Sequence, residues 1–252
     1  MTAIGQQTWS ALSARARPLG ERELKALSPM VILAPHPDDE TLGCGGLLAS
    51  ASERGLAPRV IFLTDGSASH RDSPSWPKAR LVETRKAEAL AALAELGVGA
   101  DQALFLGWPD SAPHRPGSAE HATSVDVVLA WLETIPPRSL WAPWPEEAHC
   151  DHEAASAFAD LVRDRLPTPA RRLDYMVWGW ASETLADVAH TDIWALRCRR
   201  HTGRRRRALA RHRTQAPGLI TDAAWSFLIP PELKALTERP TEVFLERRGD
   251  FR

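Results

Sequence analysis

Short apolar runs alternate along this chain with segments of helical periodicity, and this alternation constrains the fold more than any other feature. The runs are bounded by Gly, Pro or Asp and predict strands at 30–34, 59–64, 103–106, 139–142, 173–180 and 241–246. The spacing of apolar residues predicts helices over 80–96 and 152–166. Such alternation is typical of an α/β fold, here a Rossmann-like three-layer αβα sandwich with a mostly parallel sheet.

The domain organisation follows from where this alternation begins. Residues 1–29 are expected to form a helical N-terminal extension, and residues 30–252 the main domain. After about residue 215 the pattern predicts a closing helix, a loop and an edge strand. The 252 residues, of which 44% are hydrophobic, suffice for one sizeable core.

The charge and the cysteine content limit the classes of function expected for this chain. Lys and Arg number 31 against 32 for Asp and Glu, so the chain as a whole does not attract nucleic acid or an anionic membrane. Cys44, Cys150 and Cys198 form no C-x-x-C pair, which favours reduced thiols over a disulfide framework or a Cys-based zinc site. No segment has the length and apolar character of a membrane span, and residues 1–29 lack an uninterrupted apolar run, so a cytoplasmic location is expected.

The first polar cluster follows the apolar run 30–34. It contains His36, Asp38, Asp39 and Glu40, at the start of a glycine-rich segment. One imidazole and three carboxylates at the end of a strand are typical of a site that binds a metal ion and activates a water molecule. The alternative is that the carboxylates cap the next helix and complement its dipole, with His36 a surface loop residue.

A second cluster, His149-Cys150-Asp151-His152, favours the metal interpretation. It follows the apolar run 139–143 and precedes a helical pattern. Two such clusters, each between a strand and a helix, are hard to explain by capping alone, so we expect two halves of one metal site. Asp65 and Asp110 also follow predicted strands, and the carboxyl ends of parallel strands converge at one edge of a sheet.

The glycines after the first cluster have a structural interpretation. Gly43, Gly45 and Gly46 do not complete a G-x-G-x-x-G dinucleotide motif, and the acidic residues before them would repel a pyrophosphate. They are expected to allow close packing of a helix on the sheet beneath the site.

Taken together, these motifs resemble the PIG-L/LmbE family of zinc-dependent deacetylases, which remove N-acetyl groups from glucosamine-containing compounds. Six segments carry the resemblance, in the family's order: 36–40, 64–66, 83–88, 105–110, 149–152 and, more faintly, 208–215. The resemblance implies a hydrolase of the N-acetylglucosaminyl deacetylase type, whose partner is a small-molecule N-acetylated amino sugar or its conjugate.

Roles in the metal site follow from the chemistry and from this resemblance. A zinc hydrolase uses about three protein ligands and keeps one position for water, and the resemblance selects His36, Asp39 and His152. The expected cofactor is Zn²⁺, with Fe²⁺ as the alternative. Asp38, next to a ligand, is expected to be the general base that takes a proton from the attacking water.

The second cluster supplies the other catalytic expectations. A protonated His149 suits stabilisation of the oxyanion, and Asp151 is expected to hold His149 in its cationic form and orientation. The family usually has Pro where this chain has Cys150, for which a small packing role is favoured over redox sensitivity. Some members have a Tyr, able to act as an acid, where this chain has Glu147. The acid that protonates the leaving amine therefore remains open between His149 and Asp38.

Two residues are expected to contact the substrate. The resemblance suggests that Arg85 reaches sugar hydroxyls or a linked anionic group, and the alternative is an ion pair on the helix surface. Asp110, at a predicted strand end, is expected to accept hydrogen bonds from sugar hydroxyls. Of the ten tryptophans, Trp108, Trp144, Trp178 and Trp180 lie near predicted strand ends, where a ring can stack on a sugar, although most are expected in the core.

A basic segment, Arg197 to Arg213, supports a competing function. It contains nine arginines and no acidic residue. One hypothesis is a nucleic-acid or phosphate-binding module in which the metal site is structural or phosphoesteric. The others are a solvated helix face paired with acids elsewhere, or a site for an anionic part of the substrate. The near-neutral charge of the chain favours a small-molecule substrate over nucleic acid.

Overall fold

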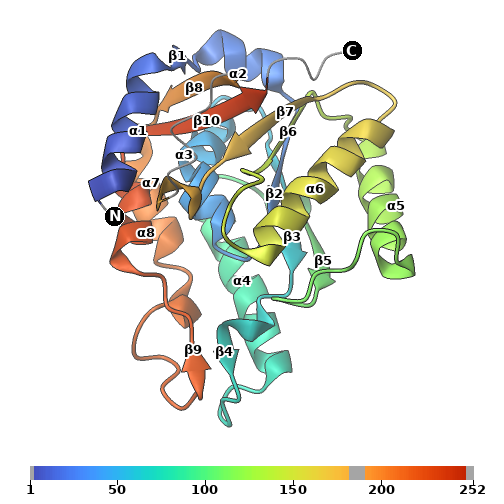
Figure 1. Cartoon of the computed structure of the whole chain (residues 1–252), viewed down its shortest axis with the longest axis vertical. Coiled ribbons are helices and arrows are strands. Elements are labelled where there is room, and N and C mark those ends of the chain that lie inside the picture. Colours follow the sequence, from blue (N-terminus) through green and yellow to red (C-terminus); the bar gives the residue numbers. More distant parts are fainter. Residues whose placement is uncertain (1–2, 182–190, 248–252) are drawn as a thin grey trace.

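The computed structural model describes residues 3–181 and 191–247, built around one eight-stranded sheet in the order β1-β8-β10-β7-β6-β2-β3-β5 (Figure 1). The strands are β1 (Arg17–Pro18), β2 (Met30–Ala34), β3 (Arg59–Thr64), β5 (Ala103–Trp108), β6 (Ser139–Pro143), β7 (Arg171–Tyr175), β8 (Thr191–Arg197) and β10 (Thr241–Arg247). Only β10 runs antiparallel to its neighbours, β7 and β8, so the sheet is mostly parallel as predicted.

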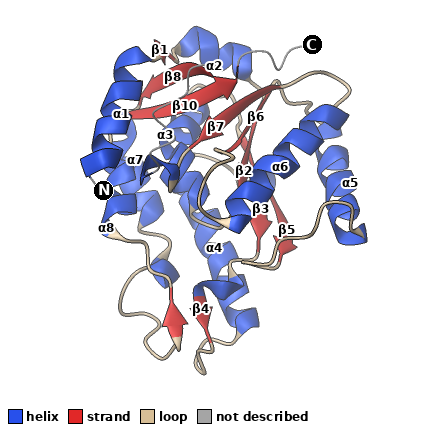
Figure 2. Cartoon of the chain, viewed as in Figure 1, coloured by secondary structure: helices blue, strands red, loops and turns tan. Residues whose placement is uncertain are grey.

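Helices cover both faces of this sheet (Figure 2). They are α1 (Ala3–Arg15), α2 (Glu21–Leu27), α3 (Asp39–Glu53), α4 (Lys78–Leu96), α5 (Ala119–Glu133), α6 (Cys150–Arg165), α7 (Thr202–Leu209) and α8 (Pro231–Lys234). The fully buried β2 divides the core: Met30 and Ile32 pack with α3 and α4, whereas Val31 and Leu33 pack with α5 and α6. This confirms the three-layer αβα fold.

A small second sheet projects from the body beyond the carboxyl ends of the parallel strands. It pairs β4 (His70–Arg71) with β9 (Trp225–Ser226) and lies at the bottom of Figure 1. A separate apolar cluster of Trp76, Leu81 and Ile220 supports it. No described helix is long and apolar enough to cross a membrane.

The structure corrects two strand predictions. The strand expected over 173–180 is β7, which ends at Tyr175, so residues 176–180 lie outside the sheet. The strand expected over 241–246 is β10, but it lies inside the sheet and not at an edge, because it pairs with both β7 and β8. The sequence analysis did not predict β8.

Residues 1–29 do contain two helices, α1 and α2, and also the short strand β1. This strand pairs with β8, and Leu12, Leu24 and Leu27 lie in the same apolar cluster as the main core. The N-terminal segment therefore packs as part of the α/β body. Whether it is a separable extension remains a prediction.

The glycines of α3 have the expected packing role. A Cβ on Gly43 would lie 2.3 Å from the ring of Tyr175, and one on Gly46 would lie 2.6 Å from the Cβ of Cys198. Tyr175 is fully buried and donates a hydrogen bond to the carbonyl of Leu33 at 2.8 Å. Helix α3 can approach the sheet this closely only because these positions carry no side chain.

Candidate active site

The carboxyl ends of four parallel strands bring the predicted polar residues together. His36 follows β2, Asp65 follows β3, Asp110 follows β5 and His149 follows β6. The Nε2 atom of His36 lies 3.5 Å from the Asp110 carboxylate. The Asp65 carboxylate accepts a hydrogen bond from the backbone N–H of Asp110 at 3.2 Å. The two halves of the expected site therefore meet at one edge of the sheet.

His36, Asp39 and His152 form a group able to hold a metal ion. One ligand atom from each lies within 4.8 Å of the other two. Asp39 is central, with Oδ2 3.1 Å from Nδ1 of His36 and 3.3 Å from Nε2 of His152. Apart from its contact with Asp39, the buried Nε2 atom of His152 forms no hydrogen bond among the described residues, so a metal ion that displaced its proton could bind it. Two imidazoles and a carboxylate are a donor set that suits Zn²⁺ or Fe²⁺.

The protonation of this group reflects the same arrangement. Burial disfavours the charged form of His152, but the carboxylates of Asp39 and Glu147 outweigh burial and raise its pKa to about 9. Hydrogen bonds to Asp110, Asp151 and Asp39 raise the pKa of His36 in the same way, against the effect of burial. The protons on the two imidazoles thus balance the negative charge of the carboxylates. A bound metal cation would balance the same charge.

Glu147 supports the candidate site, and the sequence analysis gave it no role. It is fully buried, and its carboxylate accepts a hydrogen bond from Nδ1 of His152 at 2.7 Å. The same carboxylate accepts backbone N–H groups of Val177 at 2.6 Å, Trp178 at 3.2 Å and Gly179 at 2.9 Å. A carboxylate behind a metal-binding histidine fixes the ring and its tautomer. The only sequence signal was an acidic residue two positions before His149.

Asp38 lies at the N-cap of α3 with an unusual backbone. Its φ is 148°, a conformation that a residue with a side chain rarely adopts, so the surrounding contacts hold it there. Its side chain is buried, with the carboxylate 3.3 Å from the guanidinium of Arg85. Burial raises the pKa of Asp38 to about 6, although Arg85 opposes the shift. A buried carboxylate with this pKa can exchange a proton near neutral pH.

Arg85 is buried, so the interpretation as a surface ion pair is wrong. Its guanidinium donates hydrogen bonds to the carbonyls of Gly66 and Pro37, both at 2.8 Å, and to Asp38. It therefore connects the loop after β3 with the turn that carries Asp38.

The structure also corrects the expected pairing of His149 with Asp151. The carboxylate of Asp151 contacts Nε2 of His36 at 2.9 Å and accepts the backbone N–H of Ser111 at 2.8 Å. The hydrogen bond that Asp151 makes to His149 comes from its backbone N–H, which donates to Nδ1 at 3.2 Å. Asp151 therefore orients His36 rather than His149.

The expectation of a protonated His149 is not supported. Burial lowers the pKa of His149, and the nearby positive charges of His36 and His152 lower it further. Its Nδ1 already accepts a hydrogen bond from a backbone N–H, so the proton of the neutral ring belongs on Nε2.

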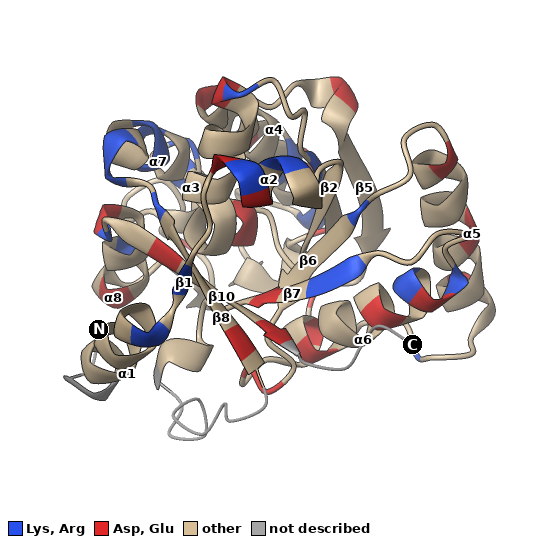
Figure 3. Ribbon diagram, turned by 90° about the horizontal axis from the view of Figure 1, so that it is seen from above, with Lys and Arg blue, Asp and Glu red and all other residues tan. Residues whose placement is uncertain are grey.

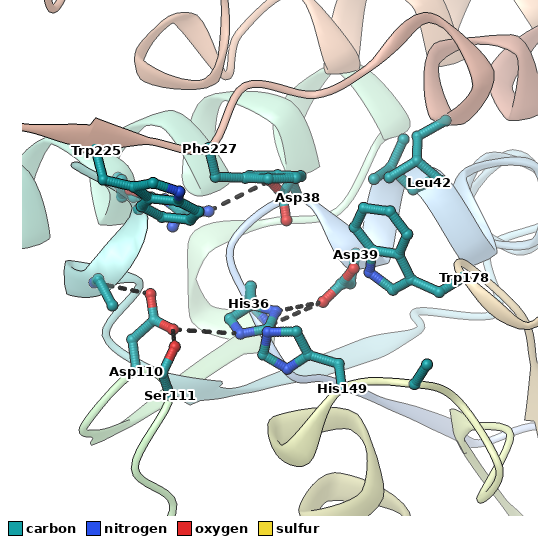
Figure 4. Close-up of a pocket in the computed structure, with 15 residues that line it drawn as sticks. His36, Asp38, Asp39, Leu42, Asp110, Ser111, His149, Trp178, Trp225 and Phe227 are labelled. Atoms are coloured by element: carbon teal, nitrogen blue, oxygen red, sulfur yellow. Dashed lines mark hydrogen bonds and ion pairs between the residues drawn. The ribbon is translucent and has the colours of Figure 1, made fainter. Parts of the chain in front are cut away.

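A pocket of about 330 Å³ opens onto this group. Figure 4 shows His36, His149 and Asp110 on one side of the pocket, Trp225 and Phe227 on the other, and Trp178 at the end near Asp39. Of the tryptophans singled out from the sequence, only Trp178 lines the pocket. Trp108, Trp144 and Trp180 are buried in the core.

Cys150 does not have the small packing role expected for it, because it is exposed. Its Sγ lies 3.7 Å from the carboxylate of Asp151. Partial burial and this negative charge raise the pKa of the thiol, which opposes formation of the reactive thiolate.

The basic segment is largely paired with acids of its own chain. Helix α7 is visibly rich in Lys and Arg in Figure 3, but acidic residues lie nearby. The pairs are Arg200 with Glu53, Arg205 with Glu242, Arg206 with Glu238, and both Arg207 and Arg211 with Glu95. These contacts support a paired helix face over a nucleic-acid-binding surface.

The fold and site together define a Rossmann-like α/β protein with a His/Asp/His group at the carboxyl edge of its sheet. A family model described as PIG-L, GlcNAc-PI de-N-acetylase, matches residues 31–162, and the chain belongs to this family.

Two individual relatives are also named as deacetylases. The chain is 31% identical over 144 residues to a 1D-myo-inositol 2-acetamido-2-deoxy-alpha-D-glucopyranoside deacetylase of Kineococcus radiotolerans, covering 52% of this chain and 35% of the relative. It is 29% identical over 164 residues to a 2'-N-acetylparomamine deacetylase of Streptomyces fradiae, covering 59% of this chain and 56% of the relative. The chain thus matches between a third and somewhat more than half of the length of these relatives.

A solved structure shows the same fold. It is an N,N'-diacetylchitobiose deacetylase from Pyrococcus horikoshii, with a TM-score of 0.56 and 20% identity, covering 75% of this chain and 70% of that one.

Proposed function

We propose that the chain is a metal-dependent hydrolase that removes the acetyl group from an N-acetylated amino sugar or its conjugate. The observation that carries the proposal is the His36, Asp39 and His152 group, with the buried carboxylate of Asp38 beside it at the base of an open pocket. The names of the curated relatives support the same reaction class. Zn²⁺ is the proposed metal, with Fe²⁺ compatible with the same ligands.

The reaction hydrolyses the amide and yields a carboxylic acid and an amine. The water oxygen bonds to the acetyl carbon, the C–N bond breaks, and acetate and the free amine leave. A divalent ion held by the three ligands would make water acidic enough to react near neutral pH and would polarise the amide carbonyl. Asp38 accepts the proton of the attacking water and returns one to the leaving nitrogen, which its pKa of about 6 permits.

His149 stabilises the oxyanion as a neutral donor. With Nδ1 accepting from the backbone, Nε2–H is free to point at the carbonyl oxygen as negative charge develops. Asp151 acts on the ligand His36 and not on His149.

Asp110 is the proposed contact for sugar hydroxyls. Hydrogen bonding to His36 outweighs the effect of burial and lowers its pKa, so it remains an ionised acceptor. Arg85 lines the same pocket, but its terminal nitrogens bind Gly66, Pro37 and Asp38. We therefore propose that Arg85 acts on the substrate indirectly, by positioning Asp38.

The proposal is tested by metal analysis together with an amine-release assay on a panel of N-acetylglucosaminides. His152→Ala should lose the metal and the activity. Asp38→Asn should keep the metal and lose about 10²- to 10⁴-fold in kcat, as expected for loss of a general base. Asp126→Asn, at an exposed position of α5, is the matched control and should behave as the parent protein.

Three outcomes would contradict the proposal. Full metal content in His152→Ala would remove this residue from the ligand set. Near-normal kcat in Asp38→Asn would leave Asp38 as a helix cap. Failure of the metal-loaded protein to release amine from any member of the panel would overturn the proposed reaction.

A further inference from the structure

Part of the pocket lining is an apolar wall. It consists of Leu42, Trp178, Trp225, Phe227 and Leu233. Leu42 lies on α3, Trp178 follows β7, Trp225 lies on β9 and Leu233 lies on α8. Segments far apart in the sequence thus contribute large apolar side chains to one pocket, and Figure 4 shows Trp225 and Phe227 across the cavity from His36.

Trp225 is unusually exposed for its size. Its exposed fraction is 52%, compared with 44% and 45% for Val127 and Ile135, the other large apolar side chains that the described residues expose. Both of those lie at the far helix α5 or just after it, whereas Trp225 borders the pocket. An exposed indole at the mouth of a cavity is a typical contact for the flat face of a ligand.

The position of Trp225 is fixed by the small second sheet. Arg71 of β4 pairs in register with Trp225 of β9, and its guanidinium lies 5.3 Å from the centre of the indole ring. The carboxylate of Asp222 accepts hydrogen bonds from Ser73 and from the backbone N–H of Ser75, which ties together the two segments around this sheet. The indole is therefore held at the pocket and is not the tip of a free loop.

The inner part of the wall is fixed as well. The backbone N–H of Phe227 donates to the carbonyl of Ser69 at 2.7 Å, and the Phe227 ring contacts that of Trp178 with centroids 5.8 Å apart. The backbone N–H of Trp178 donates to the buried Glu147. A wall held before the ligand arrives loses little conformational entropy on binding.

The charges of the pocket restrict what can lie along this wall. Its polar side carries the carboxylates of Asp38, Asp39 and Asp110. Among the described lining residues, Arg85 is the only Lys or Arg, and its terminal nitrogens already bind backbone carbonyls and Asp38. A phosphate or nucleotide attached to the sugar would find no free arginine or lysine among the described lining residues to pair with its charge.

We infer that the substrate is an N-acetylated amino sugar whose aglycone is uncharged and aromatic, and that Trp225, Phe227 and Trp178 bind its flat face. This inference rests on the proposed deacetylase function and deepens it. The acetamido group would reach the metal-binding side of the pocket while the aromatic group lies on the wall, so the wall selects among conjugates of the same sugar.

The test compares three substrates that share one sugar: methyl, phenyl and 1-phosphate derivatives of N-acetylglucosamine. The parent protein should give a kcat/KM for the phenyl glycoside about tenfold or more above that for the methyl glycoside, and a lower value for the phosphate. Most of the gain should be in KM, because binding to the wall precedes the chemistry and persists through it. In Trp225→Ala the phenyl-to-methyl ratio should fall towards one, and Trp225→Phe should recover part of it.

Ile135→Ala is the matched control. It removes another exposed apolar side chain outside the pocket and should leave all rates and ratios as in the parent. Equal kcat/KM for the phenyl and methyl glycosides in the parent would overturn the inference while leaving the deacetylase function intact. A faster reaction of the phosphate would overturn it in the same way.

Failure of the proposed function is distinguishable from failure of this inference. If no substrate releases amine, calorimetric titration of the metal-loaded protein with phenyl and methyl N-acetylglucosaminide still measures how tightly each compound binds to the wall. Suppose that the phenyl compound binds more tightly and that Trp225→Ala abolishes this difference. This outcome would support binding of an aromatic group at the wall and would contradict only the proposed reaction. Equal binding of the two compounds would overturn the inference.

Discussion

At the residue scale, the environment of each histidine decides what it can do. His36 and His152 contact carboxylates that favour their charged forms, whereas the partial burial of His149 and the positive charges beside it favour its neutral form. The carboxylates beside His36 and His152 thus favour positive charge at these rings, and they would favour a bound metal cation in the same way, whereas the surroundings of His149 favour its neutral form.

His149 provides a prediction at this scale. His149→Ala should lower kcat about 10²- to 10³-fold, the usual cost of one lost oxyanion donor, with little change in KM. His149→Gln should recover part of kcat because its amide N–H can replace Nε2–H. Steady-state kinetics with metal analysis on each variant checks this, and metal loss in His149→Ala would instead identify His149 as a ligand.

Sequence reasoning at this scale located the site but not its internal contacts. The convergence of His36, Asp110 and His149 follows from the rule that parallel strands end at one edge, so their meeting was predictable. The contact of Asp151 with His36 was not predictable. It depends on the extended backbone of the N-cap His149, with φ −149° and ψ 127°, which directs the following side chains. The role of Glu147 depends on backbone N–H groups of residues 177–179, some thirty positions away in sequence.

At the element scale, the packing of α3 on the sheet controls where Asp38 and Asp39 lie, because both belong to the start of this helix. Gly43→Ala should lower the free energy of unfolding by about 1–3 kcal/mol, since its Cβ would overlap the buried Tyr175 ring. Gly45→Ala is the matched control: its Cβ would meet Arg205 at an ordinary 3.4 Å, and helix propensity favours Ala by up to about 1 kcal/mol. Chemical denaturation of the two variants measures the difference, and equal stability would show that α3 shifts freely on the sheet.

The strand that sequence reasoning missed is short in apolar residues and only partly buried. Strand β8, with sequence TDIWALR, has four consecutive apolar residues, and the arginine-rich segment begins at its last residue, Arg197. Strand β10 was found, but its place in the sheet was not. Its buried Val243, Phe244 and Leu245 are compatible with an edge or an interior strand, and only pairing with β7 and β8 decides between them.

At the scale of the whole molecule, removal of the N-terminal segment tests whether the domain can fold without residues 1–29. A chain that begins at Met30 would lose β1 and the fully buried Leu24 and Leu27, each worth about 1.5–3 kcal/mol by burial. Since a typical domain is stable by only about 5–15 kcal/mol, we expect this truncation to aggregate or unfold. Circular dichroism and size-exclusion chromatography of the purified protein measure the outcome.

Arg17→Ala is the control for that truncation, because it alters the same segment at an exposed position. Its ion pair with Asp192, at 3.6 Å, should contribute less than about 1 kcal/mol. A soluble, folded and active chain starting at Met30 would show that residues 1–29 are a separable extension, as the sequence pattern suggested.

The insertion of β10 between β7 and β8 also sets an order of assembly. Strands β8 and β1 join the eight-stranded sheet only through β10, which lies more than forty residues after β8 in the sequence. While the chain is being synthesised, β7 therefore has one unpaired edge and β8 has no partner on the β7 side until residues 241–247 emerge from the ribosome. Pairing across such sequence distances is slow, and open strand edges promote association with other chains. The five strands β2, β3, β5, β6 and β7, which carry the candidate active site at their carboxyl ends, can form first, and β10, β8 and β1 complete the sheet afterwards.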